Sequence, residues 1–157
     1  MNLKLIIAGG KGWLYDEILA EVKRLGLEGW VLFPGFVDDD DLPALYSAAA
    51  VFAYPSLYEG FGLPVLEAFA CGVPVVTSNV SSLPEVAGDA ALMVTPTDVD
   101  ALTDALWRAL TDDALRARMM AQGLAQAPRF TWDSSAWQLL AAYNRISDFP
   151  GLPAREI

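Results

Sequence analysis

The sequence contains no histidine and a single cysteine, and both shortages exclude kinds of chemistry. Any mechanism that needs an imidazole base or an imidazole metal ligand is excluded within these 157 residues. One cysteine cannot form an internal disulfide, and without histidine it makes a zinc site implausible. We therefore expect neither a bound metal nor a cofactor.

Positive charge and long hydrophobic runs are also scarce. Ten Lys and Arg stand against 20 Asp and Glu, which gives a net charge of −10. Because nucleic-acid binding depends on basic side chains that neutralise phosphates, no nucleic-acid partner is expected. Hydrophobic residues make up 54% of the chain, yet no apolar run approaches the roughly 18–20 residues of a membrane span. The start at Met1–Lys4 shows no signal peptide, so we expect that either the protein is cytoplasmic or this start is not the native one.

Short apolar segments alternate with helical patterns along the chain. This alternation predicts an α/β fold, a doubly wound parallel sheet with helices on both faces. The five predicted strands are residues 3–8, 30–33, 51–54, 73–78 and 91–94. Right-handed crossovers favour the strand order 2-1-3-4-5. We expect the domain to span residues 1–147, with 148–157 as a tail.

That strand order also predicts where a ligand binds. The loops Gly9–Gly12 and Tyr58–Gly62 follow strands one and three. These strands would be neighbours at the switch point of the sheet, where such folds bind ligands at the carboxyl ends of their strands. Farther along, Ser82 and Glu85 have the Ser-x-x-Glu spacing of a helix capping box. The acidic run Asp38–Asp41 predicts a helix start rather than a metal site, because carboxylates favour the positive end of a helix.

The most informative segment is the loop and helix start between Glu59 and Glu67. Gly60 and Gly62 form a turn after an apolar strand, and Pro64 stands where a first helical residue would be. A helix start presents free N–H groups and suits anions. Glu67, one turn in, points back toward that site and would accept hydrogen bonds from neutral hydroxyls, as an acidic residue does with ribose. The pattern predicts a site for a phosphorylated, hydroxyl-rich ligand, although spacing alone leaves open two solvated surface glutamates.

The same residues resemble a known family. Together they are similar to the donor-binding, C-terminal domain of retaining glycosyltransferases of the two-domain GT-B type, the group 1 glycosyl transferases. The resemblance covers about residues 3–145. The segments that carry it are Phe33–Val37, Ala44–Ala49, Leu57–Glu67, Ala70–Val76, Ser82–Val86 and Phe130–Trp132.

The resemblance implies a role for each candidate residue. Glu59 would contact the donor sugar as the catalytic residue, and Glu67 would bind the ribose hydroxyls. The nucleotide base would lie between a loop after the first strand and the stretch after the second. Lys11 could touch base or phosphate, or be a solvated loop lysine. The implied donor-binding residues are Gly60, Phe61, Gly62, Leu63 and Glu67, with Gly9, Gly10, Lys11, Phe36 and Val37 on the side of the base.

The resemblance also implies parts that this sequence does not contain. The family's donor domain begins with one more strand and helix, which lie at the sheet centre and carry an Arg and a Lys that neutralise the diphosphate. The acceptor-binding domain is absent as well. We therefore expect a donor-binding half that transfers a sugar from a nucleoside diphosphate sugar only when a further domain or partner chain completes it, and that could self-associate. The alternative is a non-catalytic nucleotide-binding or interaction domain of the same fold. A flavodoxin-like or receiver-type domain is disfavoured, since the acidic cluster follows the second strand.

Overall fold

The computed structural model describes residues 3–10 and 15–146. The chain divides into two compact units, Met1–Leu45 and Tyr46–Ile157. Strands and helices alternate through both, and every strand pairing is parallel. The predicted α/β class is therefore confirmed. None of the described helices has the length and hydropathy needed to cross a membrane.

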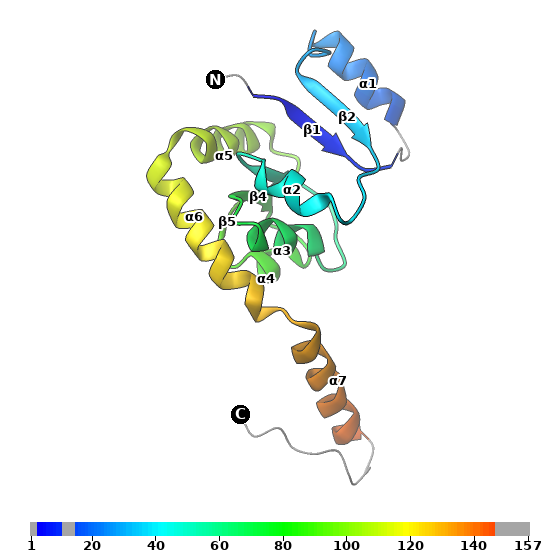
Figure 1. Cartoon of the computed structure of the whole chain (residues 1–157), viewed down its shortest axis with the longest axis vertical. Coiled ribbons are helices and arrows are strands. Elements are labelled where there is room, and N and C mark those ends of the chain that lie inside the picture. The colour runs from blue at the N-terminus through cyan, green and yellow to red at the C-terminus, as the bar shows by residue number, and fades with distance from the viewer. Residues whose placement is uncertain (1–2, 11–14, 147–157) are drawn as a thin grey trace. The chain divides into compact units, whose positions relative to one another are not determined.

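Unit 1 is a two-stranded parallel sheet with one helix along it (Figure 1). Strand β1 pairs with β2 from Leu5 opposite Val31 to Ala8 opposite Gly35. Acidic residues in the first turn of α1 and basic residues in its last turn complement the helix dipole. The elements are β1 (Leu5–Ala8), α1 (Tyr15–Arg24), β2 (Val31–Gly35) and α2 (Leu42–Ser47), which runs into unit 2.

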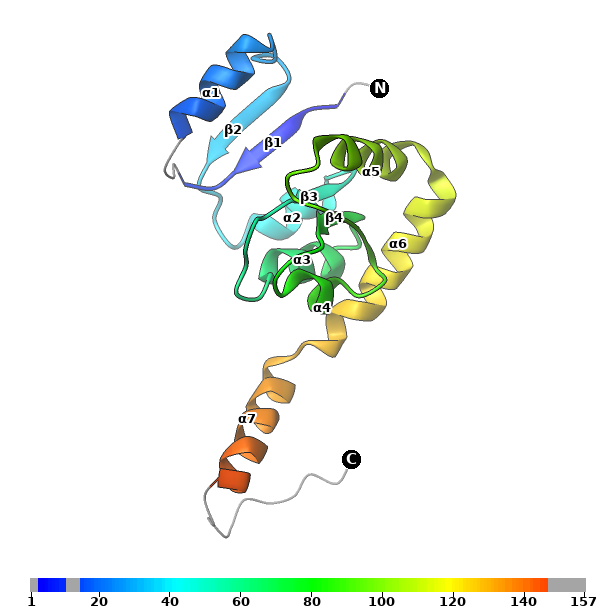
Figure 2. The same cartoon turned by 180° about the vertical axis from the view of Figure 1, so that it is seen from behind.

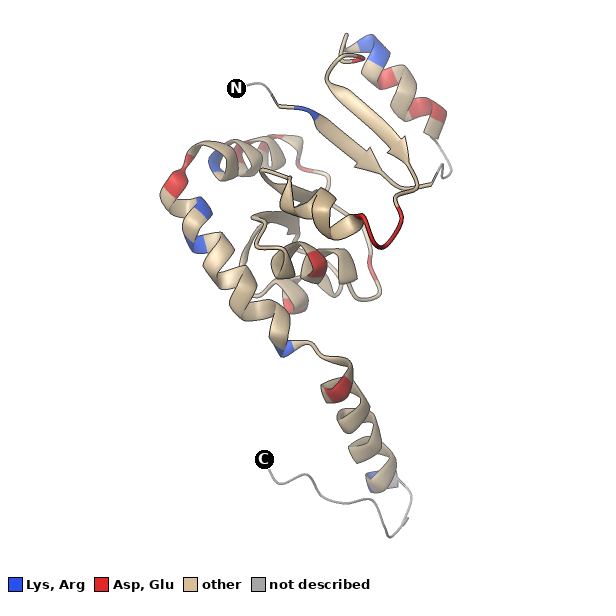
Figure 3. Ribbon diagram, in the orientation of Figure 1, with Lys and Arg blue, Asp and Glu red and all other residues tan. Residues whose placement is uncertain are grey.

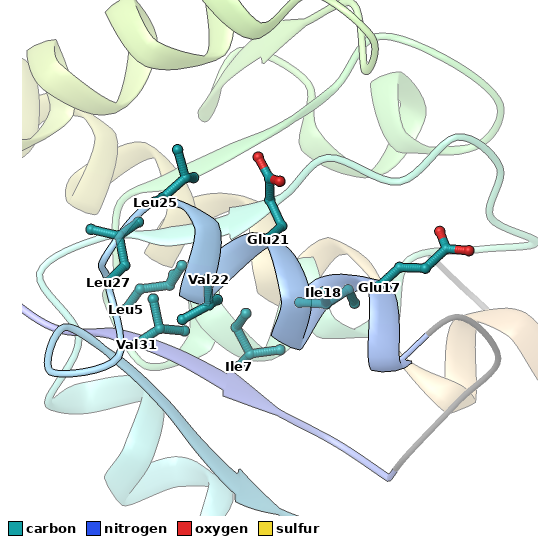
Figure 4. A pocket seen from close by; sticks show the side chains of 9 residues that line it. All are labelled: Leu5, Ile7, Glu17, Ile18, Glu21, Val22, Leu25, Leu27 and Val31. Atoms are coloured by element: carbon teal, nitrogen blue, oxygen red, sulfur yellow. The ribbon is translucent and has the colours of Figure 1, made fainter.

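Unit 1 has few buried side chains. Among its described residues, Val31 alone is buried. An apolar pocket of about 400 Å³ lies between α1 and the two strands, and Figure 4 shows Ile7, Val22 and Val31 pointing into the space between them. Leu5 is 54% exposed and Ile6 is 45% exposed. Unit 1 thus buries little apolar surface by itself.

Unit 2 is a three-stranded parallel sheet in the order β3-β4-β5, covered on both faces. Successive residues of a strand point to opposite faces, and β4 shows this clearly. Val75 packs with α3 and α4, whereas Val76 packs with α5 and α6 (Figure 2). The elements are β3 (Phe52–Tyr54), α3 (Leu63–Ala70), β4 (Val75–Ser78), α4 (Leu83–Ala87), β5 (Ala91–Val94), α5 (Val99–Thr111), α6 (Asp113–Gln126), the 3₁₀ turn η1 (Ala127–Arg129) and α7 (Trp132–Ile146).

The contact between α3 and α6 depends on a glycine. The Phe69 side chain of α3 is fully buried. A Cβ placed on Gly123 of α6 would lie only 2.7 Å from Phe69 Cδ1. Gly123 therefore lets α6 approach α3 closely enough for the aromatic ring to fill the space between the two helices.

The prediction of one five-stranded sheet is wrong. The orders 2-1 and 3-4-5 are confirmed, but β1 and β3 belong to two different sheets and are not hydrogen-bonded to each other. β1 has four residues and β3 has three, and such short apolar strands do not specify which strand they lie beside.

The predicted capping box at Ser82 is also wrong. Ser82 is the residue before α4, but its side chain makes no capping hydrogen bond. Its backbone has φ −79° and ψ −15°, which is helical. A capping side chain reaches the first helical N–H groups from an extended backbone. The acidic run Asp38–Asp41 does lead into α2 as predicted, through hydrogen bonds from the amides of Asp41 and Leu42 to the Asp38 carbonyl.

Candidate functional site

The site in unit 2 is built on the start of α3, where a glycine is required. Gly62 precedes the helix with φ 108°, a left-handed conformation that side chains rarely adopt. A Cβ at Gly62 would also lie 2.8 Å from Cδ2 of the buried Leu83. The loop can therefore pass against α4 only without a side chain. Beyond it, the Leu63 backbone N–H lies ahead of any helical partner, whereas Pro64 has no N–H and the Val65 amide donates to the Gly62 carbonyl at 3.0 Å.

Glu59 is held at the other side of this loop by two hydroxyl groups. The Tyr54 hydroxyl and Ser56 Oγ each donate a hydrogen bond to Glu59 Oε1, both at 2.7 Å. Burial, together with the bond to the Glu59 carboxylate, raises the pKa of Tyr54 to about 12. The tyrosine hydroxyl thus keeps its proton and remains a donor at neutral pH.

Glu67 has a similar arrangement. It lies one turn into α3, and its Oε2 accepts a 2.9 Å hydrogen bond from the Tyr46 hydroxyl. Burial and this bond raise the pKa of Tyr46 well above its usual value. Both candidate glutamates are therefore carboxylates whose orientation is set by a neutral tyrosine.

A second loop, which carries Ser81 and Ser82, is hydrogen-bonded to the glycine turn. This contact was not predicted from the sequence. The Glu59 amide donates to Ser81 Oγ at 3.1 Å. Ser82 Oγ lies 3.0 Å from the Glu59 carbonyl oxygen and 2.7 Å from that of Phe61, and donates to them. Ser81 has φ 53°, the only positive φ outside glycine among the described residues. The signal was present in the sequence, two serines after the fourth strand, but it matched a capping box.

The predicted residues on the side of the base lie in unit 1. Gly9 and Gly10 follow β1, and the Gly9 amide donates to the Gly35 carbonyl at 2.9 Å. That bond places the loop after β1 beside the stretch that begins with Phe36 and Val37. The Phe36 ring is 74% exposed. Lys11 falls outside the described residues.

The loop and helix that carry Glu59 and Glu67 contain no Lys or Arg. No Lys or Arg occurs between Arg24 and Arg108. Figure 3 shows acidic residues and no basic ones on the ribbons of α3 and α4. The helix N-terminus, a partial positive charge of about one half, is thus the main positive element available to an anion here.

Parallel strands alternating with helices are also the architecture of the GT-B glycosyltransferase structures that the chain resembles. The family model for "Glycosyl transferases group 1" matches residues 1–126. The chain belongs to this family.

Relatives and solved structures agree with this assignment. The chain is 52% identical over 146 residues to O-antigen chain mannosyltransferase B of Escherichia coli, covering 93% of this chain and 38% of that protein. Sucrose-phosphate synthase from Thermosynechococcus elongatus superposes with a TM-score of 0.81 at 33% identity, covering 91% of this chain and 38% of that one. Anabaena HepE in complex with UDP-glucose gives a TM-score of 0.81 at 27% identity, over 90% of this chain and 41% of that chain. The chain thus spans about two fifths of the length of each of these three proteins.

Proposed function

We propose that the chain binds a nucleoside diphosphate sugar, as the donor half of a glycosyltransferase that transfers the sugar with retention of its anomeric configuration. The observation that carries this proposal is the pair Glu59 and Glu67, two oriented carboxylates on either side of the start of α3. A carboxylate repels phosphate but accepts hydrogen bonds from hydroxyl groups. A ligand that fits must therefore be anionic at its centre and rich in hydroxyls at both ends.

Each part of such a donor has a partner in the chain. Glu59 would contact the sugar, and Glu67 the ribose hydroxyls. The backbone amides of Gly60–Leu63 would face the sugar and the distal phosphate, because a helix start presents N–H groups to anions. Gly9, Gly10, Lys11, Phe36 and Val37 would surround the base, once unit 1 adjoins the site.

Mannose is the sugar we propose. The relative that shares 52% identity over 93% of the chain is named a mannosyltransferase. The structure with UDP-glucose shares 27% identity. The higher identity favours a mannosyl donor over a glucosyl one.

Nucleotide binding by Glu67 is directly testable. We expect weak binding of one or more of GDP, UDP and ADP by calorimetry, and a loss of about 1.5–3 kcal/mol in Glu67→Ala, because hydrogen bonds to a charged acceptor are removed. This corresponds to roughly a 10- to 150-fold rise in Kd. Glu28→Ala is the matched control, since Glu28 is exposed and precedes β2, at the end of its sheet away from the ligand loops. Equal affinities for Glu67→Ala and wild type would refute the ribose assignment.

One observation favours the alternative of a non-catalytic nucleotide-binding or interaction domain. The chain has no Lys or Arg between residues 24 and 108, so the loop and helix that carry Glu59 and Glu67 supply no cation to a diphosphate leaving group, and leaving-group stabilisation is needed for transfer. We therefore propose that the chain alone is inactive. Sugar transfer after addition of an acceptor domain would support the transferase, and failure of every assembled form to bind nucleotide would support the alternative.

Helix α7 offers a surface for association. Its exposed apolar side chains include Trp132 at 82%, Leu139 at 54% and Tyr143 at 56% exposure. Exposed apolar patches promote association. We expect the chain to self-associate through this helix, and Trp132→Ser with Leu139→Ser to weaken that association. Sedimentation velocity over a range of concentrations is the measurement, and a clean monomer of the wild type at high concentration would contradict the expectation.

A further inference from the structure

The two glutamates of the site are joined by a row of three aromatic rings. The Tyr46 and Phe52 rings meet edge to face with centroids 5.2 Å apart. Phe52 stacks on Tyr54 at 5.7 Å with an interplanar angle of 20°. Tyr46 ends the row with its hydrogen bond to Glu67, and Tyr54 with its hydrogen bond to Glu59. The positions of the two hydroxyl groups are therefore fixed relative to one another by ring packing.

Each tyrosine uses only one oxygen of its glutamate. Tyr46 donates to Glu67 Oε2, and Tyr54 donates to Glu59 Oε1 together with Ser56. Among the hydrogen bonds of the described residues, none reaches the second oxygen of either carboxylate. That second oxygen is left to accept from a ligand.

Orientation matters because Glu67 is an exposed side chain. An unrestrained glutamate has several rotatable bonds, and fixing it on binding costs conformational entropy. A hydroxyl already bonded to the carboxylate meets that cost in advance.

We propose that Tyr46 and Tyr54 are positioning residues with separate targets. Tyr46 orients Glu67 toward the ribose hydroxyls, and Tyr54 orients Glu59 toward the sugar hydroxyls of the donor. The inference rests on the proposed function, because it concerns how that donor is selected. Each tyrosine then controls selectivity for one part of the ligand and leaves selectivity for the other part unchanged.

Two ratios of Kd measured by calorimetry test this. The ribose ratio is the Kd of 2′,3′-dideoxy-GDP divided by the Kd of GDP, and the sugar ratio is the Kd of GDP divided by the Kd of GDP-mannose. The UDP and ADP counterparts are run in parallel. Tyr46→Phe should lower the ribose ratio about 2- to 12-fold, the value of one hydrogen bond, and leave the sugar ratio unchanged. Tyr54→Phe should lower the sugar ratio and leave the ribose ratio unchanged. Phenylalanine keeps the ring packing and removes only the hydroxyl.

The crossed design separates positioning from general damage. A variant that is only less well folded would weaken both compounds of a pair equally and leave both ratios unchanged, which would overturn the inference. Ratios that fall together in both variants would also overturn it. If the wild type binds none of the diphosphates, the proposed function fails, and the inference fails with it; wild-type binding with unchanged ratios in both variants refutes the inference alone.

Discussion

Phe69→Ala should lower the free energy of unfolding of unit 2 by about 3–5 kcal/mol, the usual cost of truncating a buried phenylalanine. The Phe69 side chain is fully buried, with a solvent exposure of 0%. It lies in the core cluster that joins α3, β4 and α4. Its loss would leave a cavity beneath the helix that carries Glu67. Urea unfolding followed by circular dichroism measures the change.

Gly123 provides a test of the packing itself. Gly→Ala in a helix ordinarily stabilises by up to about 1 kcal/mol. At Gly123 the new Cβ would lie 2.7 Å from Phe69 Cδ1, so we expect Gly123→Ala to destabilise by about 1–3 kcal/mol instead. In a Phe69→Leu background the same change should become neutral or stabilising, because the obstructing ring is gone. The control for Phe69→Ala is Trp107→Ala, which truncates an aromatic side chain that is 63% exposed. If Trp107→Ala lowered the free energy of unfolding as much as Phe69→Ala does, burial of Phe69 would not be the cause of the loss.

Gly62→Val should lower stability by about 2–6 kcal/mol and abolish measurable nucleotide binding. The backbone at Gly62 has φ 108°, where a β-branched residue costs about 1–3 kcal/mol. The clash with Leu83, 2.8 Å from an added Cβ, costs about 1–3 kcal/mol more. The loop must then move away from α4, and the amides of the helix start move with it. Urea unfolding and calorimetry with the same diphosphates measure the two effects.

Gly60→Val is the matched control for this prediction. Gly60 lies in the same loop, has no positive φ, and a Cβ there would meet nothing within 4 Å. Its replacement should change stability by only about 0.5 kcal/mol. Equal losses of stability for the Gly60 and Gly62 variants would show that the conformation at Gly62 is not the cause.

Local sequence patterns were enough to predict the fold class and most of the helices and strands. The alternation of apolar segments with helical spacing was sufficient for the parallel α/β class, and the glycine turn before Pro64 correctly placed the start of α3. The relation of β1 to β3 could not be obtained this way, since apolar strands of three or four residues do not specify their neighbour.

The supporting contacts of the site were beyond sequence reasoning for a different reason. Tyr46 and Glu67 are 21 positions apart, and Ser82 and Phe61 are also 21 apart. Such contacts depend on how helices and strands pack, which no short motif encodes. Ser82 also fitted a local rule, the capping box, and the tertiary contact with the glycine turn overrode it.

Unit 1 has few buried side chains, and Val31 is the one buried residue among those described. This affects how readily the unit unfolds locally. Segments with few buried apolar contacts open with small free energies, independently of the global transition. Backbone amides of β1 and α1 should therefore exchange with deuterium well before those of β4. A ligand held by the Gly9–Gly10 loop would stabilise the folded form of unit 1 by mass action and would slow this exchange.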